Sequence, residues 1–535
     1  MAYIQPDGLV EFFDDLGISS NYENTLYFPT VSAKDLYFDS LTPITRATAL
    51  TYSRAERGFI RVEKPMSTMI NVGYMRFKNS SFEGKWFYAF VKNVEYINNI
   101  TTQVNFELDV MMTWMGAFHL GRCFIERQHT DSDGIGENIC YEKLSLGEYV
   151  CEGSSQTAFF SDYRIALYRA MNPDKQEVIT AQQCIKQGTC VPMLVTFFEY
   201  TQQGIQDLLD EVNDLVGDNR GDEIMTIKLV PYHWGASYTL EQDNFTVAKP
   251  YSGSTAWGTW TPKNNKLYCY PYKYLAVSNC EGEETEYKYE YFNVLPDAVD
   301  TENLYAWFKI IGTSCTPEIE ITCYPRNYEG IQDNIDKSTT MHDFPSIPWN
   351  VDGYKAYIAQ RNSTLFSNII AGAEIAGTVG AITGGPVGAL IGAGGGALYG
   401  SKQMLADNAN KILDTLSNGE LPARAPSQTK GSISANILAQ ARLKNFIFKQ
   451  MCITKNYAMM IDSYFDMYGY AVRQHGVPQM DNRPNWTYVK TTGCTVHGNL
   501  PADDGAMIEN IFDNGIRFWK NHNNIGNYNL PNAPT

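Results

Sequence analysis

The sequence predicts an α+β protein that is mainly β, with a mixed α/β region inserted in its middle and a Gly/Ala-rich apolar segment late in the chain. Three observations support this class. Residues 103–110 alternate apolar and polar side chains with a period of two, as a half-buried strand does. Aromatic residues make up 13% of the chain, with 35 Tyr, which is typical of β-rich proteins. Residues 202–217, by contrast, place apolar side chains at helical spacing.

Residues 1–149 are expected to form an N-terminal β domain. Residues 85–91 are a continuous aromatic run, and residues 98–102 separate that run from the strand at 103–110, which predicts a hairpin. The apolar face of the second strand comprises Val104, Phe106, Leu108 and Val110, and its polar face comprises Gln103, Asn105, Glu107 and Asp109. Residues 131–137 resemble a calcium loop but lack the bidentate Glu at its end, so a solvated turn is the preferred interpretation.

Residues 150–345 are expected to form the inserted mixed α/β region. The helix at 202–217 ends in a natural stop at Gly217, and strand-like runs at 191–198 and 224–230 flank it. A helix packed on a sheet is therefore the simplest arrangement. A Tyr-rich β region follows at residues 266–272, 285–291 and 318–324.

Residues 346–430 are expected to be a connector that contains the apolar segment 365–400, in which Glu374 is the only charged residue. Small residues recur at every fourth position, which would give a helix one smooth face for close packing in hydrocarbon. The candidate helix-packing glycines are Gly380, Gly384, Gly388, Gly392, Gly396 and Gly400. The candidate membrane-active residues are Leu365, Ile369, Ile370, Ile375, Val379, Ile382, Val387, Leu390, Ile391 and Leu398. Composition alone leaves two alternatives open: a membrane-active segment, or a buried or disordered Gly/Ala loop.

Residues 431–535 are expected to return to β structure after a linker at 420–435. We predict a helix at 455–468, a strand pair at 486–496 and a short helix at 508–515 that ends in Asn-Gly.

The charge balance argues against one class of function, sequence-independent nucleic-acid binding. The chain of 535 residues has 42 Lys+Arg against 59 Asp+Glu, a net charge of −17, so a sequence-independent nucleic-acid binder is disfavoured because phosphate would be repelled. Such a protein can still surround nucleic acid without binding it tightly. The 11 Cys include no Cys-x-x-Cys pair and are expected to be reduced thiols. The N-terminus lacks the pattern of a secretory signal.

Catalytic and metal-binding patterns are weak throughout the chain. It contains no His-Glu-x-x-His and no Gly-x-Ser-x-Gly, and its 7 His are dispersed without ligand spacing. A weakened dinucleotide fingerprint from Gly392 to Ala397 lies within Gly/Ala repetition, and the phosphate-loop-like Ser401-Lys402 has its two residues reversed. We therefore expect no enzyme activity and assign no catalytic, cofactor or metal residues.

Four stretches carry a family resemblance. They are residues 85–90, 101–115, 124–127 and 511–528, the last containing Ile-Phe-Asp-Asn-Gly-Ile and ending in Ile-Gly-Asn-Tyr. Together with the order of parts along the chain, they resemble the tail knob protein of small phi29-like podophages that infect Gram-positive bacteria.

The resemblance implies a structural role in the virion, at the distal end of a short tail, after synthesis in the bacterial host cytoplasm. It implies a homohexameric tube whose β-rich, tail-tube-like domain is built from the N- and C-terminal parts. Apolar loops, here residues 365–400, would plug the lumen and then help to penetrate the host membrane. The implied partners are other copies of the chain, other tail and collar proteins, the host membrane, and viral DNA that passes without specific binding.

The acidic composition agrees with such a conduit, because a repelling wall lets a duplex slide. Two alternatives stay open at this point. One is a receptor-binding module carried by residues 150–345, and the other is a tail-tip enzyme that degrades the cell wall.

Overall fold

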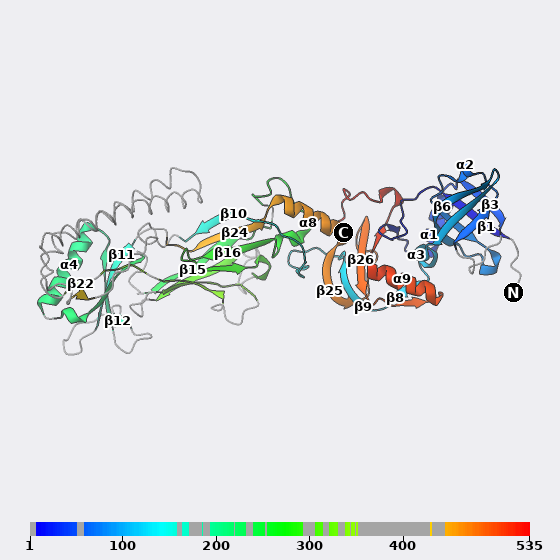
Figure 1. The fold of residues 1–535 in the computed structure, drawn as a ribbon. Coiled ribbons are helices and arrows are strands. Elements are labelled where there is room, and N and C mark those ends of the chain that lie inside the picture. The colour runs from blue at the N-terminus through cyan, green and yellow to red at the C-terminus, as the bar shows by residue number, and fades with distance from the viewer. Residues whose placement is uncertain are drawn as a thin grey trace. The chain divides into compact units, whose positions relative to one another are not determined.

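The computed structural model describes residues 7–50, 58–157, 163–170, 184–185, 193–218, 220–231, 239–251, 254–292, 305–313, 320–329, 337–342, 344–347, 349–350, 429–430 and 444–534. The chain divides into two compact units, whose helices and strands are labelled in Figure 1. Unit 1 comprises Met1–Gly147, Trp260–Tyr268 and Lys455–Thr535, and unit 2 comprises Glu148–Thr259 and Cys269–Thr454. The described structure is rich in strands, which confirms the mainly-β class.

The elements of unit 1 come from both ends of the chain. The strands are β1 (Gly8–Phe13), β2 (Thr25–Leu26), β3 (Thr45–Leu50), β4 (Phe59–Val62), β5 (Tyr74–Lys78), β6 (Phe87–Asn98), β7 (Thr101–Leu108), β8 (Phe118–Leu120), β9 (Cys123–Gln128), β25 (Tyr470–Gly476), β26 (Trp486–Thr492), β27 (Val496–Gly498) and β28 (Ile516–Trp519). The α-helices are α1 (Val31–Ser40), α2 (Met66–Met69), α3 (Val110–Trp114), α8 (Lys455–Tyr468) and α9 (Ala502–Asn514).

A six-stranded sheet, called sheet A below, has the order β3-β1-β5-β6-β7-β4 with antiparallel neighbours. Alternate side chains along these strands point to one face and form a core with Met69 of α2 and Val72. That core comprises Val10, Phe12, Ile60, Val62, Met69, Val72, Met75, Phe77, Phe87, Ala89, Val104 and Phe106. Burial of this face fixes the register of β7, because a shift by one residue would expose Val104 and Phe106.

A second sheet, of order β2-β28-β26-β9-β25, joins N-terminal to C-terminal strands. Trp486 of β26 and Trp519 of β28 are fully buried, with ring centroids 5.1 Å apart. The indole Nε1 of Trp519 donates to the side chain of Asn24 at 2.8 Å, and Arg517 donates to the backbone carbonyl of Glu23 at 3.1 Å. These bonds explain why distant parts of the chain fold as one unit.

Local signals set the ends of the helices in unit 1. The hydroxyl of Thr30 accepts from the backbone N–H of Ala33 and caps α1, and the carboxylate of Asp109 caps α3 by accepting from the N–H of Met112. Helix α9 ends at Gly515, whose φ of +99° is accessible to glycine and whose N–H bonds back to the carbonyls of Ile511 and Phe512.

The short segment Trp260–Tyr268 is held in unit 1 by buried polar contacts. The carboxylate of Glu142 accepts from Lys266 Nζ at 2.8 Å, from the guanidinium of Arg127 and from the N–H of Ala471 at 2.8 Å. Asp462 accepts from the backbone N–H and the side-chain amide of Asn264. Burial acts to raise the pKa of Glu142, but the charges of Lys266 and Arg127 outweigh it and hold that pKa below its ordinary value.

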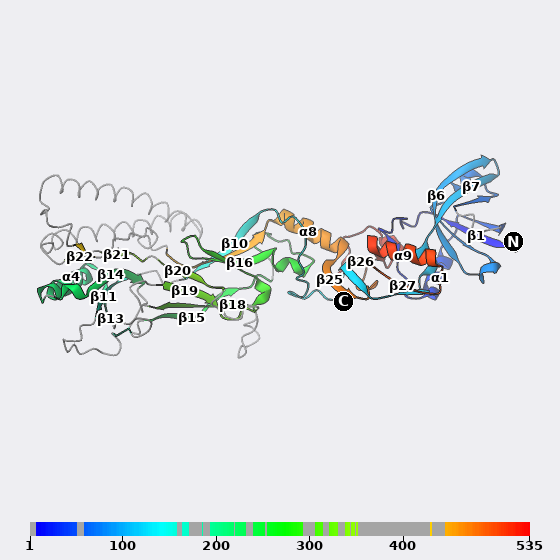
Figure 2. The same ribbon diagram turned by 60° about the horizontal axis from the view of Figure 1, so that its bottom comes forward.

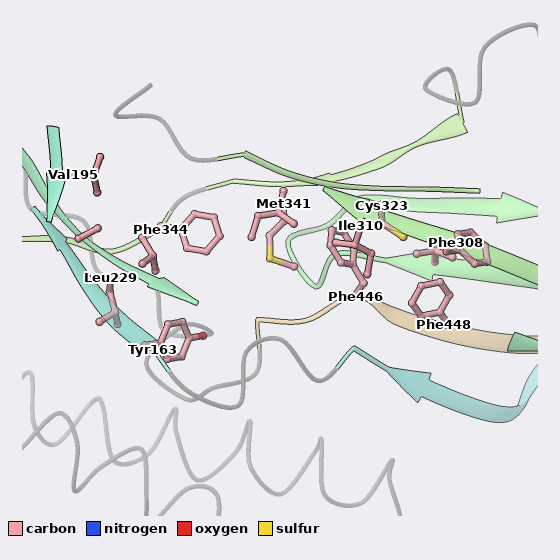
Figure 3. Close-up of a cluster of buried hydrophobic side chains, with 14 of the residues drawn as sticks. Tyr163, Val195, Leu229, Phe308, Ile310, Cys323, Met341, Phe344, Phe446 and Phe448 are labelled. Carbon is pink, nitrogen blue, oxygen red and sulfur yellow. The ribbon is translucent and has the colours of Figure 1, made fainter. Parts of the chain in front are cut away.

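In its described residues, unit 2 contains four sheets, one of them two-stranded, and one long helix. Its strands are β10 (Tyr149–Gln156), β11 (Tyr163–Ala170), β12 (Cys184–Ile185), β13 (Met193–Glu199), β14 (Ile224–Pro231), β15 (Thr239–Ala248), β16 (Lys273–Ser278), β17 (Glu284–Tyr287), β18 (Tyr305–Thr313), β19 (Glu320–Pro325), β20 (Thr339–Met341), β21 (Ser346–Ile347), β22 (Trp349–Asn350), β23 (Thr429–Lys430) and β24 (Ile447–Ile453). The helix α4 (Gln202–Gly217) buries Ile205, Leu208 and Leu215 against the core of this unit. Figure 3 shows that core, with Phe308, Phe446 and Phe448 among its members.

The structure confirms several sequence-based predictions and corrects others. Helices α4 and α8 have the predicted bounds, and β6 and β7 form the predicted hairpin. Asp109, predicted on the polar face of a strand, is instead fully buried, because the strand ends at Leu108 and Asp109 begins the next helix. The helix predicted at 508–515 begins earlier, at Ala502.

Two predictions of strand structure were wrong. Residues 266–272 do not form a strand, because Asn265–Tyr268 is a 3₁₀ turn, buried Lys266 pairs with Glu142, and Pro271 lacks the N–H that a sheet ladder needs. Residues 486–496 supply two strands that do not pair with each other: β26 lies between β28 and β9, whereas β27 pairs with β8.

Candidate assembly surface

The candidate residues from the sequence all fall in 365–400, outside the described residues. This holds for the apolar positions from Leu365 to Leu398 and for the glycines from Gly380 to Gly400. Among the residues that the structure describes, no helix combines the length and apolar character needed to cross a membrane. The site built below comes from sheet A of unit 1.

The β6–β7 hairpin extends beyond the core of sheet A. The first residues of β6 are buried, whereas its second half is largely exposed, so the hairpin projects from the packed part of the sheet (Figure 2). Its turn is fixed by the side-chain oxygen of Asn98, which accepts from the N–H groups of Ile100 and Thr101 at 3.0 and 2.8 Å. Three exposed large side chains, Tyr96, Ile97 and Ile100, gather at this end and are called the apolar tip below.

A polar network covers the exposed face of the same hairpin. The carboxylate of Glu95 accepts from the amides of Asn105 at 2.6 Å, Asn93 at 3.2 Å and Gln103 at 3.2 Å, and Arg61 of β4 donates to Gln103 at 3.0 Å. We call these five residues the amide ladder. Lys92 forms an exposed ion pair with Glu107 at 2.7 Å on the same two strands. The face is therefore rich in amides, and its lysine is neutralised by a neighbouring carboxylate.

The base of the hairpin is anchored by a buried carboxyl group. Asp109 Oδ2 accepts from the hydroxyl of Tyr74 at 2.9 Å, and its Oδ1 accepts from the hydroxyl of Tyr22 at 3.3 Å. Lys34 lies nearby and donates to the carbonyl of Met112 at 2.8 Å. Burial raises the pKa of Asp109 to about 6, and burial lowers the pKa of Lys34.

A second charge cluster, centred on buried Arg76 and Glu11, crosses the other half of sheet A. Arg76 of β5 pairs with Glu11 of β1 and with Asp39 of α1, at 2.6 and 2.8 Å, and its guanidinium lies over the ring of Trp86. Arg46 of β3 reaches the same Glu11 at 2.7 Å. These contacts tie three neighbouring strands together and hold β3 in place.

In the described part of the chain, sheet A ends at β3 on one side and at β4 on the other. Strand β4 alternates exposed Phe59 and Arg61 with buried Ile60 and Val62. The outer backbone groups of a terminal strand can pair with a strand from another chain. The apolar tip and these two edges are thus surfaces suited to assembly.

The described residues contain no group of three or more His, Cys, Asp or Glu arranged to hold a metal ion. The turn at residues 131–137, which resembles a calcium loop in sequence, uses Glu137 to accept from the N–H of Gly134 and Asp133 to accept from Asn265. These carboxylates therefore stabilise the turn and its contact with Asn265.

The sequence predicts the hairpin but not the apolar tip. Period-two alternation does not indicate where a strand leaves the core, so residues 98–102 are predicted only as the separator between the two strands. The sequence around the tip, Tyr96-Ile97-Asn98-Asn99-Ile100, does contain a signal: large apolar residues flank an Asn-Asn turn, where polar side chains are usual.

Two models of known protein families match parts of the chain. Residues 237–533 match the family model described as Bacillus phage phi29, tail knob protein gp9, C-terminal domain. Residues 7–119, which contain sheet A, match the model of the caudoviral major tail protein N-terminus.

Whole-length relatives agree with these matches. The chain is 24% identical to tail knob protein gp9 of Bacillus phage PZA, covering 99% of this chain and 100% of that protein. It is also 24% identical to the tail knob protein gp9 of Bacillus phage phi29, with the same coverage. The solved structure of the bacteriophage C1 tail knob protein, gp12, has a similar fold, with a TM-score of 0.61, 13% identity and coverage of 97% of this chain and 98% of that chain. Since the first family model matches more than half of the sequence, the chain belongs to the family of phi29-like phage tail knob proteins.

Proposed function

We propose that six copies of this tail knob protein form a tube at the distal end of the tail, through which viral DNA leaves the virion. The protein is a structural component of the phage tail, as its family membership shows. The observation that carries the proposal is sheet A: it matches a major tail protein model, and it presents the apolar tip together with two terminal strands. A grouped apolar surface of this kind is stabilised when a neighbouring copy covers it.

The amide ladder is the surface that we assign to the DNA path. Uncompensated Lys and Arg side chains hold DNA by releasing the counterions of its phosphates. Here Lys92 is paired with Glu107, and Arg61 donates to the amide of Gln103, which in turn donates to the carboxylate of Glu95. With a net charge of −17 on the whole chain, such a wall lets the duplex slide without specific binding.

The apolar segment 365–400 has a separate role in this proposal. Before infection it plugs the lumen, and during infection it leaves with the DNA and helps to penetrate the host membrane. Its near-absence of charge and its four-residue spacing of small side chains support this role, because such faces allow helices to approach closely in hydrocarbon. The remaining partners are other tail and collar proteins, and the role is non-enzymatic.

Assembly is tested by placing a charge in the apolar tip. Ile100→Asp puts a carboxylate where a neighbouring copy is expected to pack, so we expect the hexamer to be lost in light scattering after size exclusion. Leu36→Asp on α1 is the matched control, because Leu36 is 71% exposed and Ile100 is 62% exposed, and both lie in unit 1. Equal loss in both variants, or an intact hexamer in Ile100→Asp, would contradict the assignment of the tip.

The apolar segment is tested on liposomes. A chain that lacks residues 365–400 is expected to assemble but not to release an encapsulated dye, and Gly388→Leu is expected to reduce release by obstructing the small-residue face. Full release by the deletion chain would refute a membrane role for this segment while leaving the tube intact. The two experiments therefore separate the two parts of the proposal.

A further inference from the structure

Two histidines face each other where the N- and C-terminal parts of unit 1 meet. Strands β8 and β27 form a two-stranded antiparallel ribbon in which His119 lies directly opposite His497. Both side chains are exposed, and their ring centroids are 5.5 Å apart with ring planes inclined by 32°. Residues opposite each other in an antiparallel pair point to the same face of the ribbon.

We propose that His119 and His497 chelate one divalent first-row transition metal ion. Imidazole nitrogen is a preferred ligand for zinc, copper and nickel ions. Two such nitrogens at about 2.0–2.1 Å from a tetrahedral ion place the ring centroids about 5 Å apart. The observed separation of 5.5 Å is close to that value.

The backbone beneath the two rings is held in place before any ion binds. Gly121 donates to the carbonyl of Thr495 at 2.8 Å, which continues the pairing beyond the ribbon. The N–H of Val496 donates to the carboxylate of Glu509 on α9 at 2.9 Å, and Leu120 is buried in the core of the unit. A chelate on a fixed ribbon loses little conformational entropy on binding, so two imidazoles bind more tightly than two independent ones.

The residue at position 121 leaves room for the site. A Cβ atom on Gly121 would lie 3.0 Å from Nε2 of His497 and 2.2 Å from the hydroxyl of Thr495. A side chain there would displace both groups, so glycine permits the ring of His497 to lie over the backbone. The hydroxyl of Thr495 borders the same space and is a further oxygen donor beside the imidazole.

The two imidazoles leave two tetrahedral positions for water or the Thr495 hydroxyl, because the described residues supply no group of three or more His, Cys, Asp or Glu. The ion would link a strand from the N-terminal part of unit 1 to one from the C-terminal part. Since metal binding to the folded chain shifts the folding equilibrium, it also stabilises unit 1 against denaturant.

The test is calorimetric titration of Ni²⁺ into the full-length, metal-free chain without a polyhistidine tag. We expect a site that His119→Gln and His497→Gln each weaken at least tenfold, because either substitution leaves a single imidazole. His475→Gln is the matched control, since His475 is an exposed histidine on β25 of the same unit. Both target side chains are exposed, so neither substitution disturbs the core.

A second measurement is the midpoint of urea unfolding with and without Ni²⁺. The ion is expected to raise the unfolding midpoint of the wild type and of His475→Gln, but not of His119→Gln or His497→Gln. The proposal is overturned if the wild type binds no Ni²⁺, if the three variants lose affinity equally, or if both target variants keep the wild-type affinity. Ni²⁺ binding by cysteine thiols elsewhere would be the same in the wild type and the three variants. A loss of affinity in the two target variants alone therefore identifies the histidine site.

Discussion

The stability of unit 1 should depend on pH through the carboxyl group of Asp109. Burial raises its pKa to about 6 in the folded protein, against an ordinary value of 3.8. The folded state therefore holds this proton more tightly than the unfolded state does. The stability that the group contributes is fully present below pH 3.8 and is lost as the pH rises through about 6. The difference between the two pKa values corresponds to about 3 kcal/mol in total.

The substitution Asp109→Asn removes this titration while keeping an oxygen that can accept from the N–H of Met112. Between pH 4.5 and 7.5, the free energy of unfolding of Asp109→Asn should rise relative to that of the wild type by about 2 kcal/mol. Taking the difference between the two chains cancels the titration of groups that both share. Asp131→Asn, at an exposed turn of the same unit, is the matched control for replacing an Asp by an Asn.

The assay must report on unit 1 alone, because a chain with two compact units need not unfold in one step. We suggest pulsed hydrogen exchange along a urea series, read on peptides that contain α3. A difference between the two chains that stays constant, or that falls as the pH rises, would refute the reasoning. It would show that Asp109 is solvated or compensated in the folded state.

The remaining predictions concern the contacts that join distant segments of unit 1. Glu142→Gln should lower the free energy of unfolding by about 3–5 kcal/mol, because it leaves Lys266 and Arg127 buried without their carboxylate; hydrogen exchange in residues 260–268 and in β25 should rise first. Gly469→Ala should lower the free energy of unfolding more than Gly493→Ala does, and urea unfolding of the two variants would measure this. Both glycines have a positive φ, of +63° and +68°, but the new Cβ at 469 would lie 2.4 Å from the backbone of Gln128, whereas nothing lies within 4 Å at 493. Equal effects of the two alanines would show that the backbone at 469 can move aside.

Local sequence patterns correctly predicted the helices and strands that bury only one of their faces. Helix α4 carries an apolar stripe on an otherwise polar sequence, so its bounds were predicted from the sequence and confirmed. The same holds for α8 and for the alternation along β7, where one face packs in the core of sheet A.

Predictions failed where a distant residue decides the structure. Asp109 continues the alternation of β7, and nothing local reveals that Tyr22 and Tyr74 bury it at the start of a helix. Lys266 lies in a Tyr-rich run that favours a strand, but Glu142 holds it in a turn. Pairing of β27 with β8 likewise depends on contacts between remote segments.

The candidate sites differ in how much of each could be predicted from the sequence. The residues from Leu365 to Gly400 follow from composition and resemblance, and they remain predictions because they lie outside the described residues. The apolar tip was not predicted, since its exposure depends on how far β6 extends beyond the core. The pairing of His119 with His497 joins strands that are far apart in the sequence, so no spacing rule could find it.

The central claim, a hexameric tube, is tested most directly by electron microscopy of the purified full-length protein. The account predicts rings of six copies around a central channel, with the apolar tip of one copy packed against its neighbour. Monomers alone, or rings in which Tyr96, Ile97 and Ile100 all face solvent, would contradict it.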